Sequence, residues 1–228
     1  MLFDLAEKGS QTRLGNSKKV LMNRSSRLRS DVRPLVVFTI GHSTRTIADF
    51  IHLLKAHAVQ RVIDVRTIPL SRHNPQFNRD QLSSALHRVR MHYTHMPGLG
   101  GLRHARSDSS NTAWRNASFR GYADYMQTVE FDDNLSRCIA LARRERVVLM
   151  CAEAVPWRCH RSLIADALIV RGIEAMEITS GVRARPHALT LWARVRGTRV
   201  TYPASRAQTT LATDSSQASS SDRTNPRL

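Results

Sequence analysis

Three short segments of this chain carry side chains that can move protons or hold anions. Carboxylates and histidines are common acid–base groups in enzymes, and arginines bind phosphates and carboxylates through paired N–H donors. Brought together, such groups would form a site for an anionic substrate. The candidates are Gly41, His42 and Ser43; Asp64, Arg66, Ser71 and Arg72; and Cys151, Glu153, Cys159, His160 and Arg161.

Each of these segments follows a run of residues that is typical of a buried strand. The runs are short and rich in Val and Ile, and apolar residues at helical spacing separate them. Strands are predicted at 35–40, 61–65, 91–95, 146–151 and 174–178, and helices at 44–57, 78–89, 119–129, 132–144 and 159–171. Ser43 or Thr44 is the predicted N-cap of the first helix, and Gly172 ends the last one.

The alternation of strands and helices predicts an α/β domain whose mostly parallel sheet has helices on both faces. In such sheets, ligands bind beyond the carboxyl ends of the strands. We therefore expect the three segments to share one rim. Residues 34–182 form this predicted domain, after a disordered basic arm at 1–33; a basic edge segment at 183–203 and a disordered Ser-rich tail at 204–228 follow it.

The chain is strongly basic, with a formal net charge of +17. Residues 1–35 carry +5, residues 36–180 carry +6 and residues 181–228 carry +6, so most of the excess lies near the two ends. A nucleotide or a nucleic acid is the expected partner. With three cysteines, no export signal and no apolar run long enough to span a membrane, we expect a cytoplasmic protein without a disulfide framework or a membrane partner.

Several candidates have a structural interpretation as well as a functional one. Asp64 could act as an acid or base, or form an ion pair with Arg66 or with Arg161. Cys151, at the end of an apolar strand, could be a small core residue. Cys159 begins a helix, where the helix dipole attracts anions and lowers the pKa of a thiol. That position predicts an anion pocket.

Three other motifs are rejected on spacing. Cys151 and Arg158 are one residue too far apart for the phosphate cradle of cysteine phosphatases. Cys151, Cys159 and His160 have no fourth zinc ligand at a familiar spacing. The glycine-rich turn at 98–101 lacks the Lys-Ser/Thr pair of a nucleotide P-loop. The sequence therefore predicts neither a metal nor a cofactor.

The motifs, taken in order, resemble the bacterial and archaeal family called domain of unknown function 488. The resemblance covers about residues 36–180, and it implies a Rossmann-like α/β layout with a site where the motifs converge, without assigning a reaction. It adds Gly100, Gly101 and Tyr122 to the positions of interest. It rests on Thr39-Ile40-Gly41-His42-Ser43, Asp64-Val65-Arg66 with Pro69, Ser71 and Arg72, Leu99-Gly100-Gly101, Phe119, Gly121-Tyr122, Glu130-Phe131, and Leu149-Met150-Cys151-Ala152-Glu153 with Cys159-His160-Arg161.

These observations leave three hypotheses open. The first is a hydrolase acting on a nucleotide or on a base in nucleic acid, as a DNA glycosylase does. In it, Asp64 or Glu153 orients a water, His42 or His160 is the acid, and arginines hold phosphate. The second is a non-catalytic module that binds a phosphorylated ligand or nucleic acid. The third makes Cys151 or Cys159 a nucleophile or a redox thiol.

Overall fold

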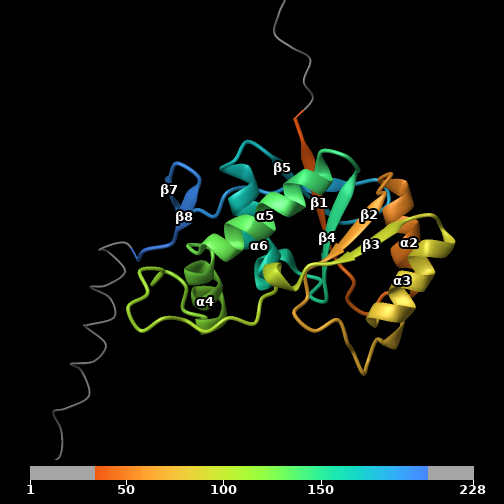
Figure 1. Cartoon of the computed structure of the whole chain (residues 1–228), viewed down its shortest axis with the longest axis horizontal. Helices are drawn as coiled ribbons and strands as arrows, with labels where there is room; N and C mark the ends of the chain where they lie inside the picture. The colour runs from red at the N-terminus through yellow and green to blue at the C-terminus, as the bar shows by residue number, and fades with distance from the viewer. Residues whose placement is uncertain (1–33, 205–228) are drawn as a thin grey trace, which may run out of the picture. The chain divides into compact units, whose positions relative to one another are not determined.

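The computed structural model describes residues 34–204, which form an α/β domain around a six-stranded sheet (Figure 1). The strand order is β3-β2-β4-β1-β5-β6, and every neighbouring pair is parallel except β5 and β6. The arm predicted for residues 1–33, and the tail beyond Ala204, lie outside the described residues. The strands are β1 (Val36–Gly41), β2 (Arg61–Asp64), β3 (His92–His95), β4 (Val147–Cys151), β5 (Glu174–Ile178) and β6 (Ala184–Pro186).

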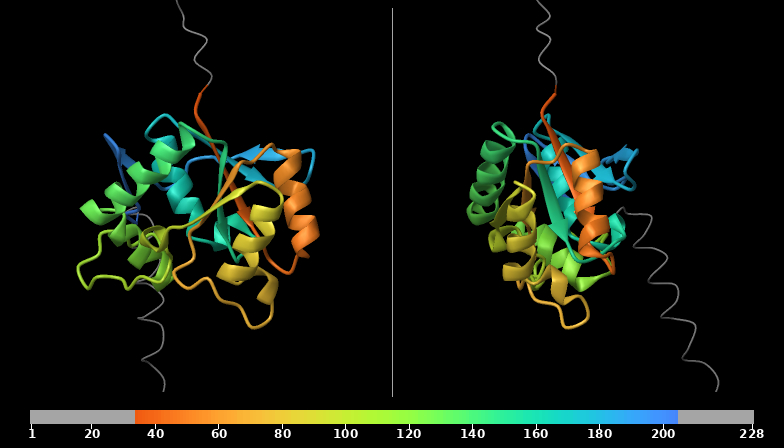
Figure 2. Two further views of the ribbon diagram at one scale, coloured as in Figure 1. Left: turned by 45° about the vertical axis from the view of Figure 1, so that its right-hand side comes forward. Right: turned by 90° about the vertical axis from the view of Figure 1, so that its right-hand side faces the viewer.

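Helices cover both faces of this sheet, as the sequence predicted, and α2 and α5 lie on opposite sides of β1 and β4 (Figure 2). Strand β4 shows why both faces are buried. Val147 and Leu149 pack with α4, α5 and α6, whereas Val148 and Met150 pack with α2 and α3. The helices are α2 (Ile47–Ala56), α3 (Arg79–Arg88), α4 (Ala117–Tyr125), α5 (Val129–Ala142) and α6 (Arg161–Ile169), with 3₁₀ turns at Pro75–Phe77, Pro97–Leu99 and Pro156–Arg158.

The start of α2 differs from the prediction. Its N-cap is Thr46, whose hydroxyl accepts a hydrogen bond from the Asp49 backbone N–H at 3.1 Å, and neither Ser43 nor Thr44 has this role. Ser43 instead adopts a left-handed backbone conformation with φ of 50°. The chain therefore makes a tight turn after β1 before the helix begins, and this turn keeps His42 and Ser43 beside the end of the strand.

The segment after residue 182 is built into the described domain. Strand β6 extends the sheet, and β7 (Arg194–Arg196) pairs with β8 (Arg199–Thr201) in a hairpin. Tyr202 is fully buried, and its hydroxyl donates a 2.8 Å hydrogen bond to Asp166 in α6. The apolar residues that face the core here are Val200 and Tyr202, whereas Leu191 is 91% exposed.

Candidate functional site

A cavity of about 400 Å³ lies at the carboxyl ends of β1, β2 and β4. The three segments predicted to carry the site all contribute residues to its wall. The loop before α4 and the first turn of that helix contribute the others. The lining residues are His42, Arg66, Thr67, Ile68, Leu70, Ser71, Gly101, Leu102, Ser118, Phe119, Cys151, Ala152, Glu153, Arg158, Cys159 and His160.

The structure brings seven of the predicted site residues to this cavity and leaves six outside its lining. Those that line it are His42, Arg66, Ser71, Cys151, Glu153, Cys159 and His160. Those outside it are Gly41, Ser43, Asp64, Arg72, Tyr122 and Arg161. Each of the six has a distinct position, which changes the role that its side chain can play.

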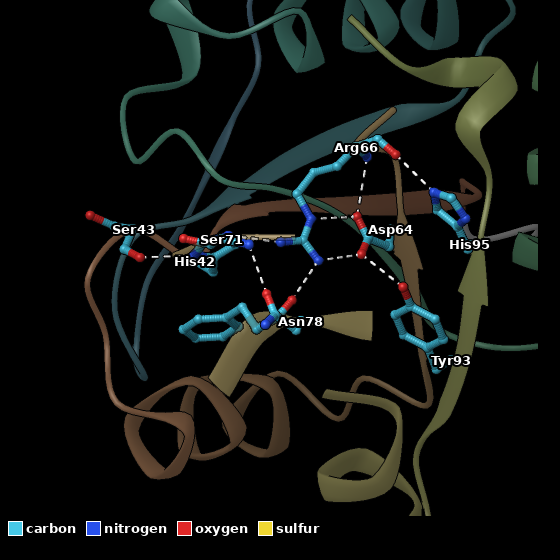
Figure 3. Close-up of polar contacts among 9 residues, drawn as sticks. His42, Ser43, Asp64, Arg66, Ser71, Asn78, Tyr93 and His95 are labelled. Carbon is cyan, nitrogen blue, oxygen red and sulfur yellow. Dashed lines mark hydrogen bonds and ion pairs between the residues drawn. The ribbon is translucent and has the colours of Figure 1, made fainter. Parts of the chain in front are cut away.

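Asp64 is fully buried and is committed to holding Arg66 (Figure 3). Arg66 Nε donates to Asp64 Oδ1 at 2.9 Å, and Nη2 donates to Oδ2 at 2.5 Å. The Arg66 backbone N–H and the Tyr93 hydroxyl donate to the same carboxylate, at 3.1 and 2.8 Å. Of the alternatives left open by the sequence, the structure therefore contains the Asp64–Arg66 ion pair. With its oxygens occupied and away from the cavity, Asp64 is a positioning residue and not the base that orients a water.

His42 also serves to position Arg66. Its Nδ1–H donates to the Ser43 carbonyl at 2.8 Å, so Nε2 is an acceptor that faces Arg66 Nη1 at 3.3 Å. The ring stacks on Phe77 with 4.2 Å between centroids. Burial, with help from the charge of Arg66, lowers the pKa of His42 from 6.5 to about 4. This shift disfavours the charged form of His42, which is the form that its predicted role as the acid requires.

Arg66 is thereby a buried cation of fixed orientation at the cavity wall. Burial alone lowers the pKa of its guanidinium, but the hydrogen bond and charge of Asp64 more than compensate, and the pKa lies above its ordinary value. The Phe77 carbonyl accepts a further hydrogen bond from Nη2 at 2.7 Å. An anion entering the cavity would meet this group without having to order it first.

Glu153 is the carboxylate that lines the cavity among the described residues. Its side chain is exposed and accepts a 3.1 Å hydrogen bond from the Val155 backbone N–H. The β4–α6 loop that carries it lies directly against β1, because a Cβ at Gly41 would overlap the Glu153 carbonyl. Gly41 is therefore needed for close packing of this loop.

Arg161 is not among the residues that line this cavity. It is 1% exposed, and its guanidinium donates to Glu177 in β5 at 3.1 Å and to the Glu153 carbonyl at 2.6 Å. The Thr39 hydroxyl also donates to Glu177. Arg161 is therefore already engaged by these two partners, and its predicted contact with a substrate anion stays a prediction. Arg161 fixes the β4–α6 loop and the start of α6 against β1 and β5.

The thiols of Cys151 and Cys159 meet the ring of His160 in the cavity wall. One ligand-capable atom from each of the three residues lies within 4.8 Å of the other two. The Cys151 thiol, the His160 ring and Arg161 lower the pKa of Cys159 by stabilising its thiolate, and together they outweigh the effect of burial. The same pairing raises the pKa of Cys151. Cys159 lies at the end of the 3₁₀ turn at Pro156–Arg158, two residues before the first residue of α6, and not within the helix as predicted.

The other predicted residues lie around the cavity. Tyr122 is fully buried, and its hydroxyl donates to the Leu99 carbonyl at 3.0 Å. Its ring packs against the ring of His160, with 5.1 Å between the centroids. Gly101 leaves room for that histidine ring, which a Cβ would overlap. Arg72 is exposed and lies beside Pro75, outside the residues that line the cavity, and its predicted contact with a bound anion stays a prediction.

Sequence reasoning missed the apolar part of the wall. Ile68, Leu70 and Leu102 are each at least 60% exposed, although they are large and apolar, and Phe119 lies with them around the cavity. Exposed apolar side chains that gather at a concave surface indicate a ligand contact. The available signal was the placement of Ile68 and Leu70 on either side of Pro69, within a loop and not within a strand or helix.

A mostly parallel sheet with helices on both faces and a cavity at the carboxyl ends of its strands defines an α/β domain of Rossmann-like layout. The model of the family described as domain of unknown function DUF488 matches residues 46–168, more than half of the chain, and the protein belongs to this family. The matched range includes Asp64, Glu153 and the Cys159-His160-Arg161 segment. No curated protein and no solved structure matches the chain. None of the helices in residues 34–204 is long and apolar enough to cross a membrane.

Proposed function

We propose that the cavity binds a nucleotide, or a base of a nucleic acid, and that the protein is a hydrolase acting on it. The observation that carries this proposal is the gathering of one exposed carboxylate, Glu153, with the guanidinium groups of Arg66 and Arg158 in a cavity whose other wall is apolar. A volume of about 400 Å³ lies within the range of small-molecule sites.

The two walls fit the two halves of such a ligand. A nucleobase is flat and largely apolar on its faces, and Phe119, Leu70 and Leu102 offer it a surface to pack against. Phosphate oxygens accept paired hydrogen bonds from guanidinium groups. Arg158 is exposed and Arg66 is held rigidly, so one can adapt to the ligand while the other fixes its register.

In the proposed reaction, Glu153 accepts a proton from the attacking water. Asp64 is excluded from this role by its buried ion pair, so Glu153 is the base. The arginines stabilise negative charge as it develops on the phosphate or the leaving group. Neither histidine is assigned as the acid, because His42 is neutral and His160 is engaged with Cys159.

The experiment compares Glu153→Gln with Glu174→Gln, a control at the opposite end of the sheet. Both variants and the unmodified chain are incubated with a panel of nucleotides and of DNA oligonucleotides carrying modified bases, and products are separated by mass spectrometry. We expect Glu153→Gln to lower turnover by about 10²–10⁴-fold, with Glu174→Gln unchanged. Full turnover in Glu153→Gln would overturn this proposal.

The second candidate, a binding module, is favoured by one observation: Asp64 and His42 are both committed to orienting an anion-holding arginine. Its signature is a saturable ligand-induced rise in Tm with no product formed over hours. Arg158→Gln should weaken the binding of phosphorylated ligands about tenfold or more under either function. The Glu153→Gln comparison therefore separates the two, and the arginine variant does not.

A further inference from the structure

We propose that Cys151, Cys159 and His160 bind a Zn²⁺ ion and leave its fourth coordination position open to the main cavity. Spacing along the chain argued against zinc because a fourth ligand is missing. That objection applies to structural zinc sites, which are closed by four protein ligands. Catalytic zinc sites have three protein ligands and keep one position for water or substrate, and two Cys with one His is an attested set.

The spacing of the ligand atoms fits a tetrahedral ion. Zn–S bonds of about 2.3 Å and Zn–N bonds of about 2.0–2.1 Å place neighbouring ligand atoms about 3.5–3.8 Å apart. The three ligand-capable atoms here lie within 4.8 Å of one another, and Cys159 Sγ lies 3.8 Å from His160 Nδ1. The ligand atoms are therefore at most about 1 Å farther apart than a tetrahedral zinc site requires.

The fold holds these side chains in place without a ligand. Cys151 ends a central strand, and Cys159 and His160 directly precede α6. The start of this helix is fixed by Arg161 through Glu177 and the Glu153 carbonyl. The Tyr122 ring supports His160 on one side. A metal site needs such support, because ligand side chains that are free to move bind a metal weakly.

The ring of His160 lacks the polar partners that a buried imidazole normally has. Its Nε2 is buried without any hydrogen bond, and Nδ1 has only the long contact to Cys159 Sγ. Buried polar side-chain atoms in native proteins nearly always have a partner, and each exception needs an explanation. A metal bond to Nδ1, the nitrogen beside Cys159 Sγ, would replace this long contact with a strong one, and Nε2 would still have no partner among the described residues.

The local charge also permits a divalent cation. The buried guanidinium groups of Arg66 and Arg161 are each neutralised by their own carboxylate, Asp64 and Glu177. Two thiolates would then balance the two positive charges of the ion. An N–H donor near a metal-bound thiolate, as Arg161 provides, belongs to the outer shell that orients such ligands.

The open position gives the ion a role in the proposed hydrolysis, and this step alone rests on the proposed function. All three ligand residues and Glu153 line the same cavity, so a water bound to the ion would occupy a space that the Glu153 side chain also borders. Zn²⁺ lowers the pKa of a bound water to about 7, and the carboxylate can accept its proton. Two Cys, one His and a Glu that is not a ligand also activate water in zinc enzymes that act on nucleobases.

The test measures metal content first. The full chain, expressed without a histidine tag and dialysed, is analysed by inductively coupled plasma mass spectrometry and then reconstituted with Co²⁺. We expect one zinc per chain, and a cobalt form with intense thiolate-to-metal absorption. The Cys159→Ser and His160→Asn variants should lose the stoichiometric metal. Cys138→Ala, which removes a buried thiol within α5, should retain it.

The cobalt spectrum of the unmodified chain needs no variant, so misfolding of a variant cannot hide the result. A chain that takes up neither ion, or that keeps stoichiometric metal in both cluster variants, would overturn the site. The site would also be overturned if the chain, after saturation with metal, had a mass two hydrogen atoms below that of the reduced chain, because that mass would show a Cys151–Cys159 disulfide. Bound zinc without turnover on the nucleotide panel would contradict the proposed function alone. Glu153-dependent turnover in metal-free protein would contradict the role of the ion in the hydrolysis, whereas the metal content alone decides whether the site exists.

Discussion

Arg66 binds both oxygens of the Asp64 carboxylate, with Nε 2.9 Å from Oδ1 and Nη2 2.5 Å from Oδ2. The two residues are separated by Val65 alone, and the backbone N–H of Arg66 donates to the same carboxylate. A short turn at the end of β2 therefore builds a closed ion pair. The two side chains also form hydrogen bonds with Tyr93, with the Phe77 carbonyl and with His42, and Arg66 lines the cavity.

We predict that Asp64→Asn destabilises the fold strongly. The substitution removes the charge that balances a guanidinium buried to 6% exposure, and breaking one side of a buried ion pair costs about 3–5 kcal/mol. Urea denaturation of the variant should show a correspondingly lower free energy of unfolding. Asp108→Asn is the matched control, because its ion pair with Arg106 is fully exposed and its loss should leave the unfolding curve unchanged. Equal curves for the two variants would contradict the role given to Asp64.

The second prediction concerns pH. The pKa of His42 is about 4 in the folded protein and 6.5 in its ordinary state, so the unfolded chain binds the proton more readily. Stability is therefore full above pH 6.5 and falls as the pH drops from 6.5 to 4, by at most about 3 kcal/mol. Unfolding free energies at pH 7, 5.5 and 4.5 should show this loss in the unmodified chain and a smaller loss in His42→Asn. Parallel pH curves for the two proteins would count against a neutral buried His42.

Much of the architecture was accessible from the sequence because its signals are local. The apolar run of β4 and the helical spacing of Leu163, Ile164, Ala167 and Leu168 depend on residues within one or two turns of each other. The convergence of the three segments at one rim was also predictable, because the carboxyl ends of parallel strands lie at the same edge of a sheet. Helix ends were less accurate, since a cap such as Thr46 is chosen by the geometry of the preceding turn.

The partners of the charged side chains could not be predicted in the same way. Successive residues of a helix point about 100° apart, so His160 lines the cavity while Arg161 turns toward Glu177 on another strand. Nothing in the local sequence says which carboxylate Arg161 will meet. The close approach of Cys151 to His160 likewise depends on the conformation of the loop between them, which their spacing along the chain does not specify.

The third prediction tests the close approach of the β4–α6 loop to β1. A Cβ at Gly41 would overlap the Glu153 carbonyl, so Gly41→Ala must push the loop outward and should cost about 1–3 kcal/mol of stability. Because Glu153 moves with the loop, ligand-induced rises in Tm should also decrease. Gly181→Ala is the control, since its nearest neighbour would be 3.7 Å away in ordinary contact. An alanine at residue 41 that unfolds like the control would show that the loop is free to adjust.

The fourth prediction concerns the segment after residue 182, which α6 holds through Asp166. This buried carboxylate accepts hydrogen bonds from the Tyr202 hydroxyl and His187 Nε2, both at 2.8 Å, and from the Thr190 backbone N–H at 3.0 Å. Tyr202→Phe removes one donor to a charged group and should lower the unfolding free energy by about 1.5–3 kcal/mol. A chain that ends at residue 182 would lose all three donors and expose the edge of β5, so we expect it to aggregate or to melt at a much lower temperature. Calorimetry of the two proteins beside the full chain measures both effects, and a truncated chain with the full-length Tm would show that residues 34–182 are a domain that is stable by itself.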